Sequence, residues 1–306
     1  MNEFISNFQS AAPHPSYVTL SNGGPPYPTL LDFLDARFPK VGRETWRLRL
    51  ETGKIFDNNG QPVTLETTYV PHTRLRYYRE VEQEPHIPFQ EKIVFQNEHL
   101  LVVCKPHFLP VTPSGPYVNE CLLYRLKKKI GVDDIVPIHR IDRETAGLVM
   151  FSLNKNTRGL YHGLFCSGQI HKAYEAITTL PTDLTRREWL LKSRIVRGEP
   201  WFRVCHEEGP INAITRVTLI DRSESHAYLR LEPFTGKQHQ LRLQLTLLGC
   251  QIFHDRYYPV LQPKQPDDYN HPLQLLAKEL DFLDPLTQHV LQFRATRSLH
   301  WEKSQE

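Results

Sequence analysis

The sequence predicts an α+β fold on a mixed, mostly antiparallel sheet. Segments with strand-like alternation follow one another along the 306-residue chain more often than they follow helical segments, which is typical of α+β proteins. Residues 211–220 and 225–233 show this best, because two alternating runs separated by a short polar turn predict an antiparallel pair. The chain also exceeds one typical domain, which favours a main domain of about 200 residues and a smaller one.

The N-terminal part of the chain predicts a small module of its own. Residues 1–28 are rich in Pro, Ser, Asn and Gly and are expected to be irregular. Residues 29–38 carry apolar side chains at helical spacing, with Thr29 as a cap, and Pro39 ends the pattern. Residues 44–51 predict a second short helix.

A short hairpin is expected after these helices. An Asn-Asn-Gly turn at residues 58–60 follows a short extended segment. We therefore assign residues 29–80 to a small α/β module, residues 81–91 to a charged, Pro-containing linker, and residues 92–302 to the main domain.

The main domain is predicted to combine several strands with two helices. Each helical segment ends before a glycine, Gly168 or Gly249, which is a common helix stop. The expected elements, in order, are strands over residues 92–96, 100–105 and 148–152, a helix over 156–167, strands over 170–178, 211–220 and 225–233, and a helix over 237–248.

The composition describes a globular protein without membrane or cofactor motifs. Hydrophobic residues make up 40% and charged residues 23%, which supplies enough apolar material for a core. The sequence has no signal-peptide core and no run of ~18 apolar residues, so we expect a cytoplasmic protein without membrane contact. Five scattered cysteines without CxxC spacing disfavour disulfides and a zinc ribbon. Because glycine-rich phosphate loops are also missing, we expect no metal and no small-molecule cofactor.

The positive charge is clustered although the net charge is only +3. One compact run contains Lys127, Lys128 and Lys129, and a second basic stretch lies between residues 186 and 203. Such runs are often no more than solvated faces. Next to a nucleic-acid site they would contact phosphates, so we include the three lysines among the candidate substrate-binding residues.

The most informative segment is PIHRIDRETAGLVMF, at residues 137–151. It places Asp142 two residues after Arg140 and three after His139, directly before a small-residue turn and an apolar strand. A single carboxylate flanked by positive charge stays ionised at neutral pH and can act as a nucleophile. The alternative is a surface turn in which an arginine and an aspartate pair in solvent.

This string resembles the HRLDxxTSGLL signature of the RluA-type pseudouridine synthases, which modify ribosomal and transfer RNA. Ile141 replaces Leu, and Ala146 replaces Ser. The resemblance implies that Asp142 is the essential catalytic residue and that Arg140 fills the space left when the target nucleotide flips out of the RNA. It also places His139 in the substrate-binding loop, which we expect it to orient by hydrogen bonding.

A second string, GKQHQLRLQLTLLG at residues 236–249, is similar to the family's GRTHQIRxHxxxxG motif. The similarity implies that Arg242 is the cationic partner of Asp142. His239 lies three residues earlier, which would place it on the same face of the expected helix and beside the substrate. The alternative is an amphipathic helix whose arginine faces water.

Three positions depart from this motif. Lys237 stands for an arginine, Gln238 for a threonine or serine, and Gln244 for a histidine. A lysine keeps the charge but loses the bidentate geometry that an arginine offers to a phosphate. We expect Lys237 to bind substrate, and we expect the three changes to alter contacts to the RNA backbone rather than catalysis.

The third string, KAYEAI, resembles the family's KxYxAxV strand and implies that Tyr174 stacks against the target base. A strand tyrosine is also a common packing residue. Because a phenol ordinarily titrates near 10, it is a poor base, and stacking is the safer role. Two looser matches are HDRYYP at residues 254–259, similar to GDxxYG, and the turn at residues 104–111, similar to DKPxGLxV but without its glycine.

The resemblance covers residues 92–296 and implies an RNA pseudouridine synthase. This isomerase breaks the glycosidic bond of a uridine and rejoins the base through carbon, without a cofactor. We expect structured RNA as the partner, with 23S ribosomal RNA first and transfer RNA second, and a monomeric protein. Residues 29–80 loosely resemble the S4 RNA-binding module that often precedes this domain; the alternative is an N-terminal cap without a binding role.

Two other functions remain open. A catalytically inactive RNA-binding protein of the same fold is suggested by the three departures, but pure binding has no need of a buried Asp–Arg pair. A glycoside hydrolase would need two carboxylates around the sugar, and only Asp142 has a convincing context.

Overall fold

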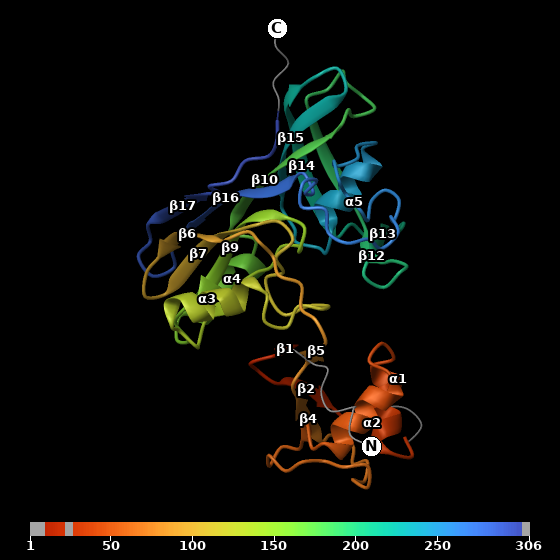
Figure 1. The fold of residues 1–306 in the computed structure, drawn as a ribbon. Coiled ribbons are helices and arrows are strands. Elements are labelled where there is room, and N and C mark those ends of the chain that lie inside the picture. The colour runs from red at the N-terminus through yellow and green to blue at the C-terminus, as the bar shows by residue number, and fades with distance from the viewer. Residues whose placement is uncertain (1–9, 22–26, 302–306) are drawn as a thin grey trace. The chain divides into compact units, whose positions relative to one another are not determined.

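The computed structural model describes residues 10–21 and 27–301 of a chain that forms two compact units (Figure 1). Unit 1 comprises residues 1–85 together with residues 113–119, and unit 2 comprises residues 86–112 and 120–306. Among the described residues, every helix is too short or too polar to cross a bilayer.

Unit 1 contains two helices and several short strands. Its elements are β1 (Ser10–Ala11), β2 (Ser16–Thr19), α1 (Leu30–Arg37), α2 (Arg43–Glu51), β3 (Ile55–Phe56), β4 (Arg74–Tyr77) and β5 (Glu80–Val81). β2, β4 and β3 form an antiparallel sheet in that order, and β1 pairs with β5. Both predicted helices are present, and the Thr29 side chain caps α1 by accepting a hydrogen bond from the backbone N–H of Asp32 at 3.1 Å.

One expectation for this region is wrong. Residues 16–19 were assigned to an irregular segment but form β2, because Val18 pairs with Leu75 and buries its side chain in the core of unit 1. Residues 1–9 and 22–26, which belong to the same expected segment, lie outside the described residues.

The arginines around α2 are engaged with carboxylates. Arg43, Arg47 and Arg49 each lie within ion-pair distance of an acidic side chain. Their partners are Asp32, Glu44 and Glu80, at 2.7, 2.7 and 3.6 Å. Positive charge that is matched within the unit leaves less for phosphate. An S4-like RNA-binding role for residues 29–80 therefore stays a prediction.

Unit 2 is built on one large sheet. Its strands follow the order β11-β14-β15-β10-β16-β9-β7-β6, while β17 pairs with β16 and β8 pairs with β9. The neighbouring strands are antiparallel except for β9 and β16, which run parallel. The predicted α+β fold on a mixed, mostly antiparallel sheet is confirmed, as is the antiparallel pairing of β14 with β15.

Unit 2 contains three helices among strands β6 to β17 within the described residues. In chain order, its elements are β6 (Lys92–Gln96), β7 (Leu100–Lys105), α3 (Leu122–Ile130), β8 (Val136–Pro137), β9 (Ala146–Ser152), α4 (Arg158–Cys166), β10 (His171–Thr179), β11 (Glu188–Ser193), β12 (Ile195–Arg197), β13 (Val204–His206), β14 (Ala213–Arg222), β15 (His226–Pro233), α5 (Gln240–Leu247), β16 (Leu275–Leu283) and β17 (Val290–Arg294).

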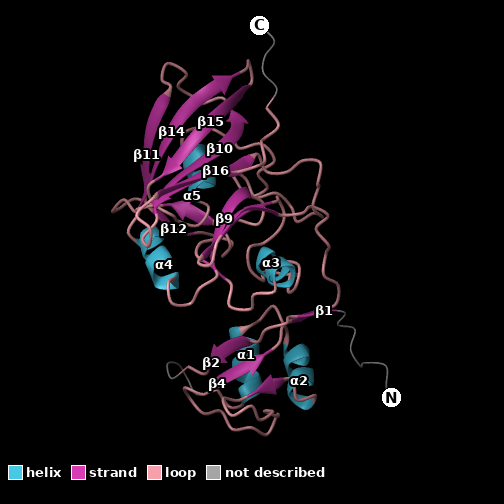
Figure 2. Ribbon diagram, turned by 90° about the vertical axis from the view of Figure 1, so that its left-hand side faces the viewer, coloured by secondary structure: helices cyan, strands magenta, loops and turns pink. Residues whose placement is uncertain are grey.

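α4 and α5, both labelled in Figure 2, contribute side chains to different hydrophobic cores of unit 2. α4 contributes Tyr161 and Leu164 to a core with β7, β9 and β16. α5 contributes Leu241 and Leu245 to a second core with β14 and β15.

Two helices of unit 2 differ from the expected ones. α5 begins at Gln240 rather than at residue 237. α3 forms where only a basic run was noted, because Leu122 and Leu126 face the interior at helical spacing. The division between the two units falls between Pro85 and His86, inside the expected linker of residues 81–91. Within unit 2, Ile87 is fully buried, and its carbonyl accepts a hydrogen bond from Arg125 at 2.6 Å.

Candidate active site

The loop that carries Asp142 is held by the strand that follows it. β9 begins at Ala146, and Gly147 has a φ of +112° and lies against β16. A Cβ at this position would lie 2.2 Å from the carbonyl oxygen of Ala277, so only glycine permits the two strands to approach this closely. This contact fixes the end of the Asp142 loop beside Ala277 of β16.

The sheet register then brings Asp142 close to Tyr174. Gly147 on β9 pairs with Ala277 on β16, and Ala277 also pairs with Tyr174 on β10. These three residues therefore lie side by side on successive strands. A loop that ends at Gly147 and a side chain on β10 consequently open onto the same cavity.

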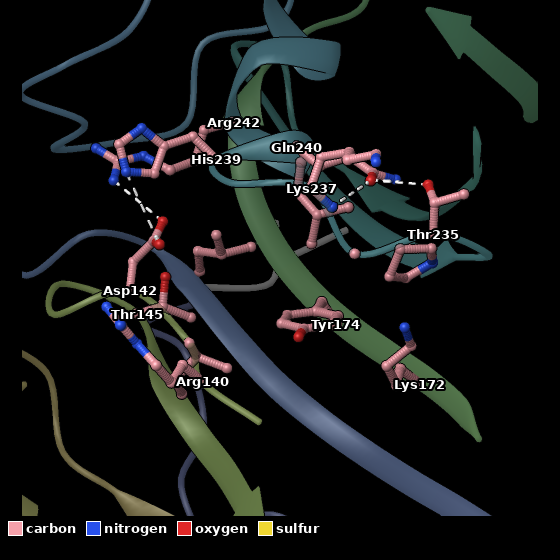
Figure 3. Close-up of a pocket in the computed structure, with 15 residues that line it drawn as sticks. Arg140, Asp142, Thr145, Lys172, Tyr174, Thr235, Lys237, His239, Gln240 and Arg242 are labelled. Atoms are coloured by element: carbon pink, nitrogen blue, oxygen red, sulfur yellow. Dashed lines mark hydrogen bonds and ion pairs between the residues drawn. The ribbon is translucent and has the colours of Figure 1, made fainter. Parts of the chain in front are cut away.

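Six of the ten predicted site residues line one cavity of about 110 Å³. They are Arg140, Asp142, Tyr174, Lys237, His239 and Arg242. Figure 3 shows Asp142 pointing toward His239 and Arg242, with Tyr174 across the cavity on its strand. Residues about 100 positions apart in sequence thus meet at one site, as the motifs predicted.

Arg242 holds two aspartates at different distances. Its Nε and Nη2 donate to the two carboxylate oxygens of Asp255 at 2.8 and 2.6 Å, which is the bidentate geometry. Its Nη1 lies 3.4 Å from Oδ2 of Asp142. The predicted contact between Asp142 and Arg242 is present, and Asp255 is the stronger anchor of the guanidinium.

The surroundings of Arg242 stabilise its charge. The side chain is 1% exposed, and its guanidinium lies over the ring of Tyr257 at 4.8 Å from the centroid. Burial opposes the charge, but the hydrogen bonds and charge of Asp255, followed by the charges of Asp142 and Glu144, raise the pKa of Arg242 above its ordinary value. Arg242 is therefore a permanent cation at the floor of the cavity.

His239 reaches Asp142 by a route other than the expected helical face. It precedes α5 in a left-handed conformation, with a φ of +48°. Its Nδ1 lies 3.1 Å from the hydroxyl of Tyr258, and its Nε2 lies 3.8 Å from Oδ1 of Asp142. Burial lowers the pKa of His239 more than Asp142 raises it, so the ring is neutral at neutral pH.

Tyr174 keeps its proton at neutral pH. The pKa of its phenol is raised above the ordinary value, chiefly by burial and to a smaller extent by the negative charge of Asp142. A phenol with a raised pKa supplies little phenolate to act as a base. The ring is therefore available as a flat surface beside Asp142 rather than as a ready proton acceptor.

His139 lies outside the cavity lining. Its Nε2 accepts a hydrogen bond from the backbone N–H of Met150 at 3.1 Å, and its ring stacks on Phe165 with centroids 4.4 Å apart. Burial lowers the pKa of His139 to about 3, which keeps Nε2 available as an acceptor. His139 thus ties the Asp142 loop to β9 and α4, in keeping with the orienting role expected for it.

Lys127, Lys128 and Lys129 lie on α3 and do not line the cavity. Lys129 makes an ion pair with Glu91 at 3.0 Å, while Lys128 is exposed. The neighbouring Arg125 donates to backbone carbonyls and so has a structural role. Any RNA contact of the three lysines would therefore lie outside this cavity.

The expectation for Gln244 is wrong. Its side chain is buried inside unit 2, where it accepts from the hydroxyl of Thr215 at 2.6 Å and donates to the hydroxyl of Ser193 at 2.9 Å. It therefore joins α5 to β14 and β11 and cannot touch the RNA backbone. Gln238 is exposed, and its amide donates to the carbonyl of Phe202 at 3.0 Å.

Sequence reasoning missed several residues of the site. Lys172 and Thr145 line the cavity, and Asp255 anchors Arg242. Lys172 could have been found, because it lies two residues before Tyr174 and so faces the same side of β10. Burial lowers its pKa. Asp255 was seen in the HDRYYP turn, but a turn motif alone does not say which cation it binds.

A buried lysine supports the loop from behind. Lys105 is fully buried at the end of β7, and its Nζ donates to the carbonyls of Pro106, Leu109 and Arg143 at 2.9, 2.7 and 3.0 Å. Burial lowers its pKa to about 7. Lys105 thereby joins the turn after β7 to the residue next to Asp142.

One cluster outside the cavity has metal-type ligands. His171, Glu279 and Asp281 lie close together on the sheet. Both carboxylates are already paired with arginines, Glu279 with Arg230 and Asp281 with Arg294. Two guanidinium groups beside these oxygens disfavour a cation there.

Comparisons with known proteins match this site and fold. The family model described as RNA pseudouridylate synthase matches residues 99–247. An uncharacterised RNA pseudouridine synthase of Synechocystis sp. is 27% identical over 87% of this chain and 93% of its own length. The dual-specificity RNA pseudouridine synthase RluA of Pasteurella multocida is 31% identical over 66% of this chain and 91% of its own length.

The chain belongs to the RluA-type pseudouridine synthases. It is an isomerase that converts uridine in RNA to pseudouridine. Two human solved structures share its fold. RNA pseudouridylate synthase domain containing 1 aligns with a TM-score of 0.57 at 20% identity over 70% of this chain and 86% of that one. RNA pseudouridylate synthase domain containing 4 aligns with a TM-score of 0.53 at 24% identity over 68% of this chain and 88% of that one.

Proposed function

We propose that Asp142 is the nucleophile of this pseudouridine synthase and that Arg242 positions it. The single observation that supports this most is the 3.4 Å contact between Arg242 Nη1 and Asp142 Oδ2 inside the cavity, with Asp255 fixing the other edge of the guanidinium. The Asp142 side chain is 27% exposed, so it can reach a substrate, whereas the Arg242 side chain is 1% exposed.

The reaction needs three events at one place. The bond between C1′ and N1 of the uridine breaks, the base turns, and a bond between C1′ and C5 forms while the C5 proton leaves. A carboxylate at the cavity mouth can attack the sugar or the uracil ring and be released again, so that no external group is consumed. The neighbouring cation stabilises the carboxylate when it leaves.

The other lining residues are assigned to binding. Tyr174 stacks on the uracil, and Arg140, exposed at the rim, occupies the space left by the flipped nucleotide. Lys237 is exposed at the opposite rim and meets a phosphate, while His239 orients Asp142. We propose structured RNA as the substrate, ribosomal RNA ahead of transfer RNA, with the protein acting as a monomer in the cytoplasm.

The test is the Asp142→Asn variant. RNA transcripts carrying tritium at C5 of uridine release tritium when pseudouridine forms. We expect Asp142→Asn to bind RNA normally and to lose at least about 10³-fold in release rate, because the amide is not a nucleophile. The matched control is Asp133→Asn, an exposed aspartate after α3, which should keep full activity. Residual turnover of Asp142→Asn within about tenfold of wild type would reject the nucleophile role.

The RNA class is tested separately. Sequencing that maps pseudouridine across total RNA, with and without this protein, should show lost sites in ribosomal RNA. Loss confined to transfer RNA would reverse the proposed order. If wild-type protein binds RNA but forms no pseudouridine on any transcript, the assignment of Asp142 as a working nucleophile fails.

A further inference from the structure

A second cavity lies behind the active-site loop. It has a volume of about 300 Å³, within the usual range for small-ligand sites, and is formed entirely by unit 2. It opens between the turn after β7 and the segment that follows β17. The residues that bear on its chemistry are Phe89, His107, Phe108, Tyr269, Arg297 and His300.

One wall of this cavity is aromatic. The ring of Phe108 lies 5.1 Å from that of Tyr269 and 6.4 Å from that of Phe89, measured between centroids. Phe89 and Tyr269 are themselves 5.4 Å apart. Tyr269 and Phe89 are both partly exposed. Such a wall offers flat apolar surface to another planar ring.

Phe108 is placed in this wall against a conformational cost. It is a non-glycine residue with a φ of +66°, a left-handed conformation that costs about 1–2 kcal/mol for an L-residue. The related motif has a glycine at this point of the turn, which would adopt the conformation freely. The Phe108 ring is 4% exposed and packs against both Phe89 and Tyr269, so it supports the two partly exposed rings of the wall from the inside.

The opposite side of the cavity is cationic. Nη2 of Arg297 donates to the carbonyl of Gln90 at 2.6 Å, which fixes the guanidinium, while its Nε is buried and has no hydrogen-bond partner among the described residues. His300 lies exposed at the edge. None of the described residues that line the cavity is acidic. The site therefore favours an anion next to a planar ring.

The cavity is connected to the catalytic loop by one hydrogen bond. Nδ1 of His107 donates to the carbonyl of Glu144 at 2.7 Å, and burial lowers the pKa of His107 to about 4. The carboxylate of Glu144 lies 3.9 Å from Nη1 of Arg242. A ligand in the cavity that moves His107 would therefore also move Glu144, which lies two residues from Asp142.

We propose that this cavity binds an unstacked nucleotide, with the base on the wall formed by Phe89 and Tyr269 and the phosphate on Arg297. The inference rests on RNA being the substrate and adds a second recognition point outside the target uridine. The same chemistry could come from a nucleotide of the bound RNA or from a free mononucleotide.

Two measurements on the full chain distinguish these sources. In the first, AMP and UMP are titrated into the protein by calorimetry. In the second, the protein is photo-crosslinked to cellular RNA that carries 4-thiouridine, and the linked peptides are identified by mass spectrometry. We expect crosslinks at Tyr269 or Phe89 if the nucleotide belongs to RNA, and saturable AMP or UMP binding if it is free.

Two variants test the assignment of residues. Arg297→Gln should weaken by about tenfold whichever signal the wild type gives, mononucleotide binding or crosslinking to RNA. Phe108→Gly should weaken the same signal while relieving the left-handed strain. Melting temperatures verify that both variants fold, and Arg222→Gln, an exposed arginine at the end of β14, is the control for loss of charge. Absence of both signals overturns the proposal, as does a signal that neither variant changes. Because neither measurement needs turnover, failure of the Asp142 mechanism leaves them readable.

Discussion

Arg242 divides its guanidinium unequally between two aspartates. Asp255 receives two short hydrogen bonds and is nearly fully buried, whereas Asp142 receives one longer contact and stays accessible. The backbone N–H groups of Tyr257 and Tyr258 also donate to Asp255, at 2.8 and 3.0 Å. Asp255 therefore fixes the cation, and Asp142 remains free to react.

This division predicts the effect of Asp255→Asn. The change leaves Arg242 buried without the negative charge of its bidentate partner. Breaking a buried ion pair typically costs about 3–5 kcal/mol. We expect a lower melting temperature together with a loss of tritium release. Glu279→Gln, which breaks the more exposed pair with Arg230, should lower stability by less than Asp255→Asn does and leave release unchanged. Equal effects of the two variants would contradict a special role for Asp255.

The sequence predicted the residues of the site better than their local geometry. Asp142, Tyr174 and Arg242 meet as the three motifs implied, because each motif keeps its order and spacing. The sequence did not indicate that His239 is left-handed or that Gln244 points into the core, since helical spacing assigns both to one continuous helix. The true start of α5 depends on tertiary contacts, here the one between His239 and Tyr258.

At the scale of elements, the contact between β9 and β16 is the most constrained. It is the one parallel pair of the large sheet among the described residues, and it is held at Gly147 and Ala277. Sequence periodicity identified β6, β7, β9, β10, β14 and β15 but not β8, β11, β12, β13, β16 or β17. β16 and β17 lie in a segment that was matched to a family tail without being assigned a conformation.

Gly147→Ala tests this contact. The added methyl group would meet the carbonyl of Ala277 at 2.2 Å in a backbone conformation that alanine disfavours. We expect a loss of about 2–4 kcal/mol of unfolding free energy, measured by denaturant titration, and a displaced Asp142 loop with reduced activity. Gly159→Ala, in α4 with open space around it, should instead gain about 0.5–1 kcal/mol. A neutral Gly147→Ala would show that the strands separate easily.

The basic run on α3 makes a different prediction. Replacing Lys127, Lys128 and Lys129 with alanine should weaken RNA binding and flatten its dependence on salt, because each phosphate contact contributes about one unit of slope. Lys128→Ala alone should produce roughly one third of the change. A salt slope that stays the same in the triple variant would show that α3 does not touch RNA.

At the scale of the whole protein, acid stability depends on buried histidines. Burial lowers the pKa of His139 to about 3 and that of His107 to about 4, whereas an unfolded histidine titrates near 6.5. Below about pH 6.5 the unfolded chain binds protons that the folded chain does not, so stability falls as pH decreases toward 4.

Melting temperatures measured between pH 7 and pH 4.5 check this sign. Wild type should lose stability steadily below about pH 6.5, and His139→Gln, which keeps an acceptor for Met150, should show a shallower decline. The exposed His162 serves as control, and His162→Gln should follow the wild-type curve. A His139→Gln curve parallel to wild type would indicate that this ring is charged in the folded state.

The composition of unit 1 affects how this protein can be recombined with its relatives. Residues 113–119 complete that unit although they come from the middle of the catalytic sequence, and Val118 among them is fully buried. A chimera that exchanges only residues 1–85 would therefore keep residues 113–119 of the original protein, which would not match the new N-terminal unit. Replacing the N-terminal unit requires residues 1–85 and residues 113–119 to be exchanged together. Recombination at a single point in the gene would therefore not transfer the whole unit.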